Sequence, residues 1–167
     1  RSNAQSRVLE EALLRAKMPY RIYGGQRFFE RAEIRNALSY MRLINTRDSD
    51  AAFERVVNTP PRGIGDRTIG EVRARARQVG CSLWQAAMEL SQAPGASVRV
   101  RKALQTFIDF MAKLDEATAE LSLEDLCEHV IEATGLKDYH GKEGGERGQA
   151  RTENLEELLN ACRAFHP

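Results

Sequence analysis

Apolar residues recur every three or four positions along most of the chain, which is the spacing of one buried face on an α-helix. The longest such stripe runs from about residue 98 to 121 and predicts the central helix of a bundle. Other stripes predict helices at about 5–17, 30–44, 66–79, 122–134 and 151–165, with short helices after Ser49 and Ser82. We therefore expect a mainly α-helical protein of roughly seven or eight helices.

The first 25 residues depart from this helical spacing. Residues 20–23 (Tyr-Arg-Ile-Tyr) alternate as a short β-strand does, after Pro19 ends the first predicted helix, and a glycine pair follows at 24–25. Because a single strand cannot form a sheet, we expect residues 1–25 to be a short α/β piece of a larger sheet domain. A second glycine-rich stretch, residues 141–148, predicts a mobile, charged loop.

A turn at residues 60–68 (Pro-Pro-Arg-Gly-Ile-Gly-Asp-Arg-Thr) separates two predicted helices. The prolines end the helix before it, and Asp66 or Thr68 can cap the helix after it. The free N–H groups and positive dipole end of that second helix would bind an anion, and Arg62 and Arg67 would favour a nucleic-acid phosphate. On these residues alone, an ordinary connection between helices with solvated arginines is the alternative.

Charge is distributed unevenly along the chain. The 167 residues carry a net charge of +1, but residues 1–77 hold 16 Lys and Arg against 9 Asp and Glu, whereas residues 78–167 hold 9 against 15. This asymmetry favours one surface that binds a polyanion and another that does not. In the basic half, Arg31, Arg35 and Arg42 fall within about 40° of one another on the predicted helix. They form either a phosphate-facing ridge or a solvated edge.

Composition and missing motifs exclude several classes of function. The content of 42% hydrophobic and 29% charged residues is typical of a soluble globular domain, and no apolar run approaches the ~20 residues that span a bilayer. We find no NTPase phosphate loop, metal-ligand motif or nucleophile elbow, so we expect no catalytic residue, metal or cofactor here. Three scattered cysteines, at 81, 127 and 162, favour reduced thiols in a cytoplasmic protein.

Five blocks of sequence, in this order, resemble those of the UvrD/Rep/PcrA family of superfamily 1A DNA helicases. They are residues 1–7 (RSNAQSR), 20–25 (YRIYGG), 28–34 (FFERAEI), 58–68 (NTPPRGIGDRT) and 151–158 (RTENLEEL). The resemblance covers essentially the whole chain. It implies that residues 1–25 belong to the second RecA-like subdomain (2A), and that residues 26–167 belong to an inserted all-helical subdomain (2B) that is truncated at its C-terminal end.

The family's enzymes are ATP-dependent 3′→5′ DNA helicases of mismatch and nucleotide-excision repair. Their phosphate loop, Mg²⁺ motif and arginine fingers lie outside the region that this chain resembles. The resemblance thus implies that the parent enzyme uses ATP and Mg²⁺, whereas these residues alone neither hydrolyse ATP nor unwind DNA. It also implies a junction of single-stranded and duplex DNA as the partner, and a hinge near residues 24–25 about which 2B swivels.

The resemblance also assigns candidate DNA contacts. Arg1 and Asn3 match family residues that touch the single strand. Other residues match family residues that contact the duplex backbone. They lie in the turn and on the predicted helix at 30–44, namely Arg35, Arg62, Gly63, Ile64, Gly65, Asp66, Arg67 and Thr68. Such phosphate contacts would be independent of DNA sequence and sensitive to salt. Threonine is common in relatives at the position of Pro61, which leaves the contact there in question.

Two other functions stay open on the sequence. The acidic half, including Glu153, Glu156 and Glu157, would suit a protein-interaction module for repair partners or for self-association of the helicase. An unrelated helix-hairpin-helix repair protein is the second alternative. We expect no membrane partner in either case.

Overall fold

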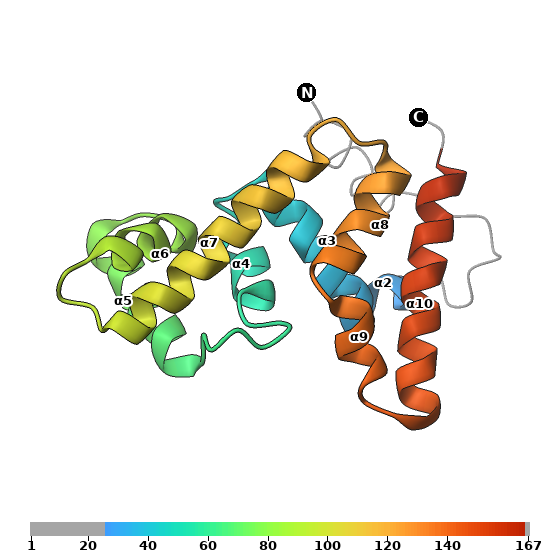
Figure 1. The fold of residues 1–167 in the computed structure, drawn as a ribbon, viewed down its shortest axis with the longest axis horizontal. Helices are drawn as coiled ribbons and strands as arrows, with labels where there is room; N and C mark the ends of the chain where they lie inside the picture. Colours follow the sequence, from blue (N-terminus) through green and yellow to red (C-terminus); the bar gives the residue numbers. More distant parts are fainter. Residues whose placement is uncertain (1–25, 166–167) are drawn as a thin grey trace.

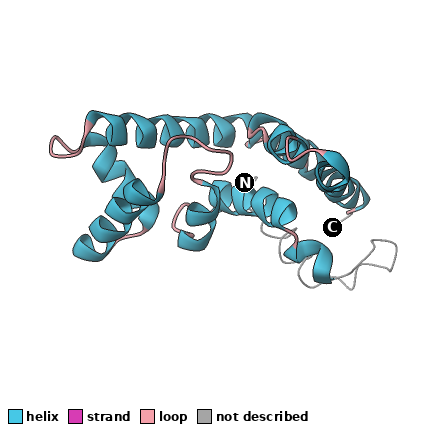
Figure 2. Cartoon of the chain, turned by 90° about the horizontal axis from the view of Figure 1, so that it is seen from below, coloured by secondary structure: helices cyan, strands magenta, loops and turns pink. Residues whose placement is uncertain are grey.

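A computed structural model describes residues 26–165, and every regular element in that range is an α-helix (Figures 1 and 2). The helices are α2 (Gln26–Glu30), α3 (Ala32–Asn45), α4 (Asp50–Val56), α5 (Asp66–Val79), α6 (Leu83–Gln92), α7 (Val98–Thr118), α8 (Leu123–Ala133), α9 (Leu136–Gly141) and α10 (Gly145–Ala164). The predicted helical class is therefore confirmed for these residues. The strand expected at 20–23, and with it the α/β piece, lies outside them.

The long helix α7 crosses the molecule and connects its two ends (Figure 1). At one end α5 and α6 pack together, with α6 lying along α7 and against α4. At the other end α8, α9 and α10 pack against one another. Helix α3 contacts α4 and α7 as well as α8, α9 and α10, so α3 and α7 together join the two ends around one hydrophobic core.

The helix ends follow signals in the sequence. The hydroxyl groups of Ser82, Ser97 and Ser122 accept hydrogen bonds from backbone N–H groups three residues later, which caps α6, α7 and α8. Gly80 ends α5 in the left-handed region, with a φ of 72°. Val79, the last residue of α5, is 45% exposed, so the buried stripe of this helix ends before it.

Three aromatic rings form the centre of the core at the α5–α6 end. Phe53, Trp84 and Phe107 come from α4, α6 and α7, and they meet edge to face with ring centroids 5.9 to 6.5 Å apart. Each such pair adds roughly 0.5–1.5 kcal/mol beyond the area that it buries. Trp84 is only 8% exposed, so it is a core residue.

The loop predicted at residues 141–148 is shorter in the structure, where residues 142–144 alone connect α9 to α10. Helix α9 extends to Gly141, and α10 begins at Gly145 rather than at residue 151. Gly148 lies inside α10, and a Cβ atom at this position would lie 2.8 Å from the carbonyl oxygen of Gly141. Gly148 therefore permits the close approach of α10 to the end of α9.

We predict that Gly148→Ala destabilises the chain, because the added methyl group would overlap a backbone carbonyl and force α9 and α10 apart. The expected loss in the free energy of unfolding is about 1–3 kcal/mol, measured by urea denaturation. Gly70→Ala is the matched control. Gly70 lies inside α5, and a Cβ atom there would have no other atom within 4 Å, so alanine should stabilise by about 0.5–1 kcal/mol. Equal effects of the two substitutions would contradict this account.

Candidate nucleic-acid interface

The turn between α4 and α5 is shaped from the inside by one asparagine. The Oδ1 atom of Asn58 accepts hydrogen bonds from the backbone N–H groups of Arg62 (2.7 Å) and Ile64 (3.2 Å). The Ile64 side chain is fully buried, and Gly63 before it has a left-handed φ of 76°. A residue with a Cβ atom is strained in that conformation, so glycine is required here. The inner side of the turn is therefore fixed, whereas Gly63 and Gly65 are exposed.

Arg62 points beneath the turn and into the protein. Its Nη1 atom donates hydrogen bonds to the carbonyl oxygens of Val56 (3.0 Å) and Pro60 (3.1 Å). Its guanidinium carbon lies 5.1 to 5.5 Å from the centroids of three aromatic rings, those of Tyr40, Phe107 and Phe110. Stacking of this kind stabilises a cation that is partly removed from water. Arg62 thus holds the turn against α3 and α7.

Tyr40 supports the same backbone from α3. Its hydroxyl group lies 3.2 Å from the carbonyl oxygen of Val56 and 2.5 Å from that of Thr59, and it can donate to either one. Burial raises the pKa of Tyr40 to about 12, against the opposing charge and hydrogen bond of Arg62. The phenol is therefore neutral at physiological pH and serves as a donor to the segment that leads into the turn.

The outer side of the turn is the N-terminus of α5. Gly65 is the N-cap residue and has no side chain with which to cap the helix, and Asp66 and Arg67 after it are exposed. The Arg67 side chain is 94% exposed, and its Nε atom lies 3.6 Å from the carboxylate of Glu71. Thr68, in contrast, is buried. The exposed first turn of a helix beside a solvated arginine is an arrangement that can bind a phosphate.

The predicted arginine ridge on α3 is exposed, but its members differ in their partners. Arg31 donates a hydrogen bond to Asn154 of α10 (2.7 Å). Within residues 26–165, Arg35 forms no ion pair. The pKa of Arg55 on α4 is lowered by burial first and by the charge of Arg35 second. Arg35 and Arg55 therefore concentrate positive charge where α3 and α4 meet.

Charged and polar side chains also join α3 to α9 and α10. Arg151 pairs with Glu143 (2.9 Å) and Glu33 (3.9 Å), and Asn154 donates to Glu33 (2.7 Å). His140 is buried beside them, with Nδ1 3.3 Å from Nη1 of Arg151. In the described part of the chain, the block at 151–158 therefore holds α10 against α3 and α9. Of the acidic residues in that block, Glu156 pairs with Lys137, and Glu153 accepts a hydrogen bond from Gln149.

Some of the predicted residues are not described by the structure. Arg1 and Asn3, and the hinge expected at 24–25, lie outside residues 26–165. Among the described residues, no group of three His, Cys, Asp or Glu side chains could hold a metal ion. None of the helices described is long and apolar enough to cross a membrane.

Sequence reasoning missed the side chains that hold the turn, namely Asn58, Tyr40 and Phe110. Asn58 carried only a general signal, because asparagine near a turn commonly bonds the backbone two residues later, whereas its bonds here reach four and six residues ahead. Tyr40 and Phe110 carried none, since they come from helices far from the turn in the sequence. Their role depends on how α3 and α7 pack.

A family model described as the UvrD-like helicase C-terminal domain matches residues 1–166. The chain belongs to the UvrD-like helicase family. DNA helicase II of Escherichia coli (strain K12) is 57% identical to it over 165 residues, which is 99% of this chain and 23% of that relative. DNA helicase II of Haemophilus influenzae is 52% identical over the same share of each chain. ATP-dependent DNA helicase PcrA of Bacillus subtilis is 35% identical over 99% of this chain and 22% of its own length.

This UvrD-like chain spans less than a quarter of the length of the curated relatives that it matches. Membership of the family excludes the alternative of an unrelated helix-hairpin-helix repair protein. The family match includes the whole turn at 58–68, in which Arg62 and Ile64 point inward and Gly63, Gly65, Asp66 and Arg67 are exposed.

We predict that Arg62→Ala destabilises the chain whereas Arg67→Ala leaves its stability unchanged. Loss of the Arg62 guanidinium would leave the Val56 and Pro60 carbonyl oxygens without this donor and open a gap among three rings. The expected cost is about 2–3 kcal/mol in the free energy of unfolding, measured by chemical denaturation. Arg67 is five residues away and makes only a long surface ion pair, so it is the matched control. Equal stability of the two variants would contradict a structural role for Arg62.

We predict that His140 makes the chain less stable as the pH falls below about 6.5. Burial and the charge of Arg151 lower the pKa of His140, against the opposing charges of Glu33 and Glu143. Because the unfolded chain then binds a proton that the folded chain does not, the stability present above pH 6.5 is lost as the pH falls through the lowered pKa. Urea denaturation between pH 5 and 8 should show this slope, and His140→Gln should reduce it.

The control for this pH experiment is His129→Gln on α8, where the histidine is half-buried. That variant separates the effect of His140 from the general effect of replacing a histidine by glutamine. A slope that survives in His140→Gln, or that disappears in His129→Gln, would assign the pH dependence to other groups.

Proposed function

We propose that this chain is the duplex-contacting and regulatory part of an ATP-dependent 3′→5′ DNA helicase of mismatch and nucleotide-excision repair. The observation that carries the proposal is the family match across residues 1–166, together with relatives that are named as DNA helicases. In this proposal residues 1–25 belong to the 2A subdomain and residues 26–167 to 2B. The parent protein binds ATP and Mg²⁺ outside these residues, so the chain alone neither hydrolyses ATP nor unwinds DNA.

The proposed duplex contact uses the outer side of the turn. The N–H groups of the exposed first turn of α5 would donate to a phosphate of the DNA backbone, and Arg67 would add a nearby positive charge. Arg35 on α3 would contact the DNA backbone, and Arg55 on α4 adds to the positive charge near it. Phosphates are the same at every base pair, so this binding is independent of DNA sequence and weakens as salt rises.

In this proposal the remaining residues of the turn hold its backbone in position. Arg62 and Ile64 point inward and Thr68 is buried, so they position the donors rather than touch DNA. Gly63 and Gly65 keep side chains away from the place that the phosphate would occupy. Arg1 and Asn3 are the proposed contacts to the single strand.

We predict that Gly65→Asp weakens duplex binding without loss of stability. Gly65 has ordinary extended backbone angles (φ −79°, ψ −177°) and open space around its Cβ direction, so aspartate fits. The carboxylate of an aspartate at the N-cap would accept hydrogen bonds from the backbone N–H groups of α5, and its negative charge would repel a phosphate. The expected result is a loss of affinity of about fivefold or more, from about 1 kcal/mol of lost interaction. Fluorescence anisotropy with an 18-base-pair duplex bearing a 3′ single-stranded tail, at low salt, is the measurement.

Gly95→Asp is the control with the same change of charge. Gly95 lies in the exposed segment between α6 and α7, also with open space around it. It should bind the duplex as the unmodified chain does. If both aspartates reduced affinity equally, net charge rather than the N-terminus of α5 would govern binding; if neither did, the proposed contact would be wrong.

A further inference from the structure

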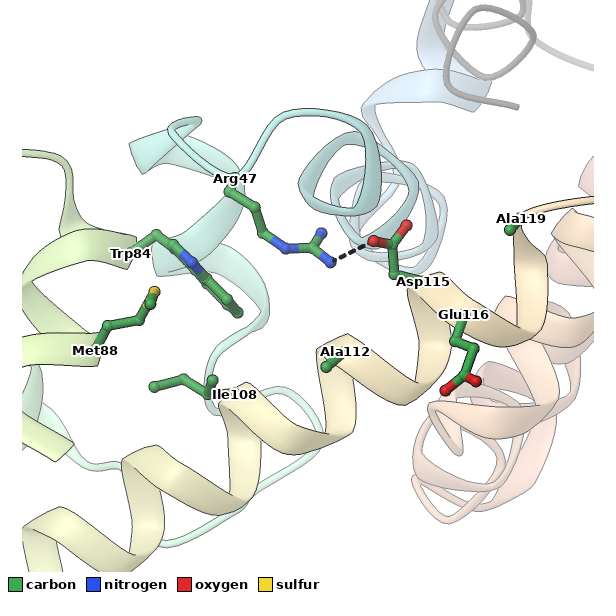
Figure 3. A pocket seen from close by; sticks show the side chains of 8 residues that line it. All are labelled: Arg47, Trp84, Met88, Ile108, Ala112, Asp115, Glu116 and Ala119. Atoms are coloured by element: carbon green, nitrogen blue, oxygen red, sulfur yellow. Dashed lines mark ion pairs between the residues drawn. The ribbon is translucent and has the colours of Figure 1, made fainter. Parts of the chain in front are cut away.

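A hollow of about 420 Å³ opens on the surface between α6, α7 and the segment that joins α3 to α4 (Figure 3). We call it the α6–α7 groove. Figure 3 shows Trp84, Met88 and Ile108 pointing toward one another across it, with Ala112 beside them on α7. Met88 is 47% exposed, so its thioether is accessible from solvent. A flexible thioether beside an aromatic ring makes an adaptable surface for another apolar side chain.

One wall of the groove is held in place by an ion pair. The Nη2 atom of Arg47 lies 3.4 Å from the carboxylate of Asp115, and the guanidinium lies 5.1 Å from the Trp84 ring centroid. Arg47 also donates to the carbonyl oxygens of Leu43 and Met111. These contacts fix the guanidinium before anything binds. The ion pair with Asp115 also offsets the positive charge of Arg47 within the protein.

The charge left at the rim of the groove is negative. Asp115 keeps 49% of its side chain exposed beside Arg47, and Glu116 next to it is exposed. The lining thus contains one arginine and two carboxylates, and because Arg47 pairs with Asp115, the net negative charge is that of Glu116. Such a rim repels a phosphate backbone and attracts lysine or arginine. The groove is therefore unsuited to DNA and suited to a partner with basic residues.

The groove and the proposed duplex contact lie on different sides of α7. Phe110, which stacks on Arg62 beneath the turn, and Ala112, which lines the groove, are about 160° apart around the helix at 100° per residue. The buried ring of Phe107 lies between the two surfaces, since it contacts both Arg62 and Trp84.

We propose that the α6–α7 groove binds a short peptide segment of another protein, in which one large aliphatic side chain is flanked by lysine or arginine. The aliphatic side chain enters between Trp84, Met88 and Ile108. The flanking cations face Asp115 and Glu116. The apolar insertion gives affinity, and the carboxylates select basic over acidic segments.

The chain carries its own reporter for this binding, because Trp84 is the only tryptophan in the 167 residues. The probe is the peptide acetyl-Lys-Ala-Leu-Arg-Lys-amide, titrated into the full chain while tryptophan fluorescence is recorded. We expect a saturable change. The same peptide with glutamate in place of its three basic residues should bind at least tenfold more weakly, as should one with serine in place of leucine.

Met88→Glu should abolish the response, because it places a carboxylate in the apolar part of the groove. Val79→Glu is the matched control, since Val79 is also about half exposed (45%) but lies at the end of α5 away from the groove lining. Glu116→Lys should reverse the preference between the basic and the acidic peptide. Circular dichroism verifies that each variant is folded.

Three results would overturn the proposal. One is no saturable change up to 1 mM basic peptide with folded chain. Another is an equal loss of binding in Met88→Glu and Val79→Glu, or an unchanged preference in Glu116→Lys. The third is dimerisation of the chain in sedimentation velocity that Met88→Glu and Val98→Ser both abolish, because Val98 is 69% exposed beside Arg99 and a second copy would then be the occupant.

Discussion

The guanidinium group of Arg62 is the contact on which the rest of this structure depends. It satisfies two carbonyl oxygens of the segment that enters the turn and lies among rings from α3 and α7. Those two helices are also the ones that join both ends of the molecule. A cation so placed fixes the turn to the middle of the core, directly before the start of α5. Asn58 and the buried Ile64 hold the same turn from the inside.

Within eight consecutive residues, 58–65, the side chains that hold the turn alternate with exposed glycines. Asn58, Arg62 and Ile64 face the core, while Gly63 and Gly65 face solvent. An exposed backbone presents the same donors whatever the DNA sequence, and it loses no side-chain entropy on binding. The proposed helicase function needs contacts of that kind, since a motor that moves along DNA meets every base pair.

Local signals predicted the helices well, because amphipathic stripes, serine caps and prolines act over a few residues. The bounds of α5 and the closing role of Gly80 followed from such signals. Two features did not follow. The inward position of Arg62 requires Tyr40 and Phe110, which only tertiary packing brings to the turn. The glycines at 141–148 resemble a flexible loop until Gly148 is found against the carbonyl of Gly141.

The difference between local signals and tertiary packing also limits what a family motif can say about function. The block at 151–158 supplies Arg151 and Asn154, and the block at 28–34 supplies Glu33, yet in the structure these residues bind one another. Two blocks thus form a joint between α3 and α10. In the block at 58–68, Asn58, Arg62 and Ile64 hold the turn against the core. A motif match therefore identifies the family, and burial and hydrogen bonding then show which residues of the motif keep its shape.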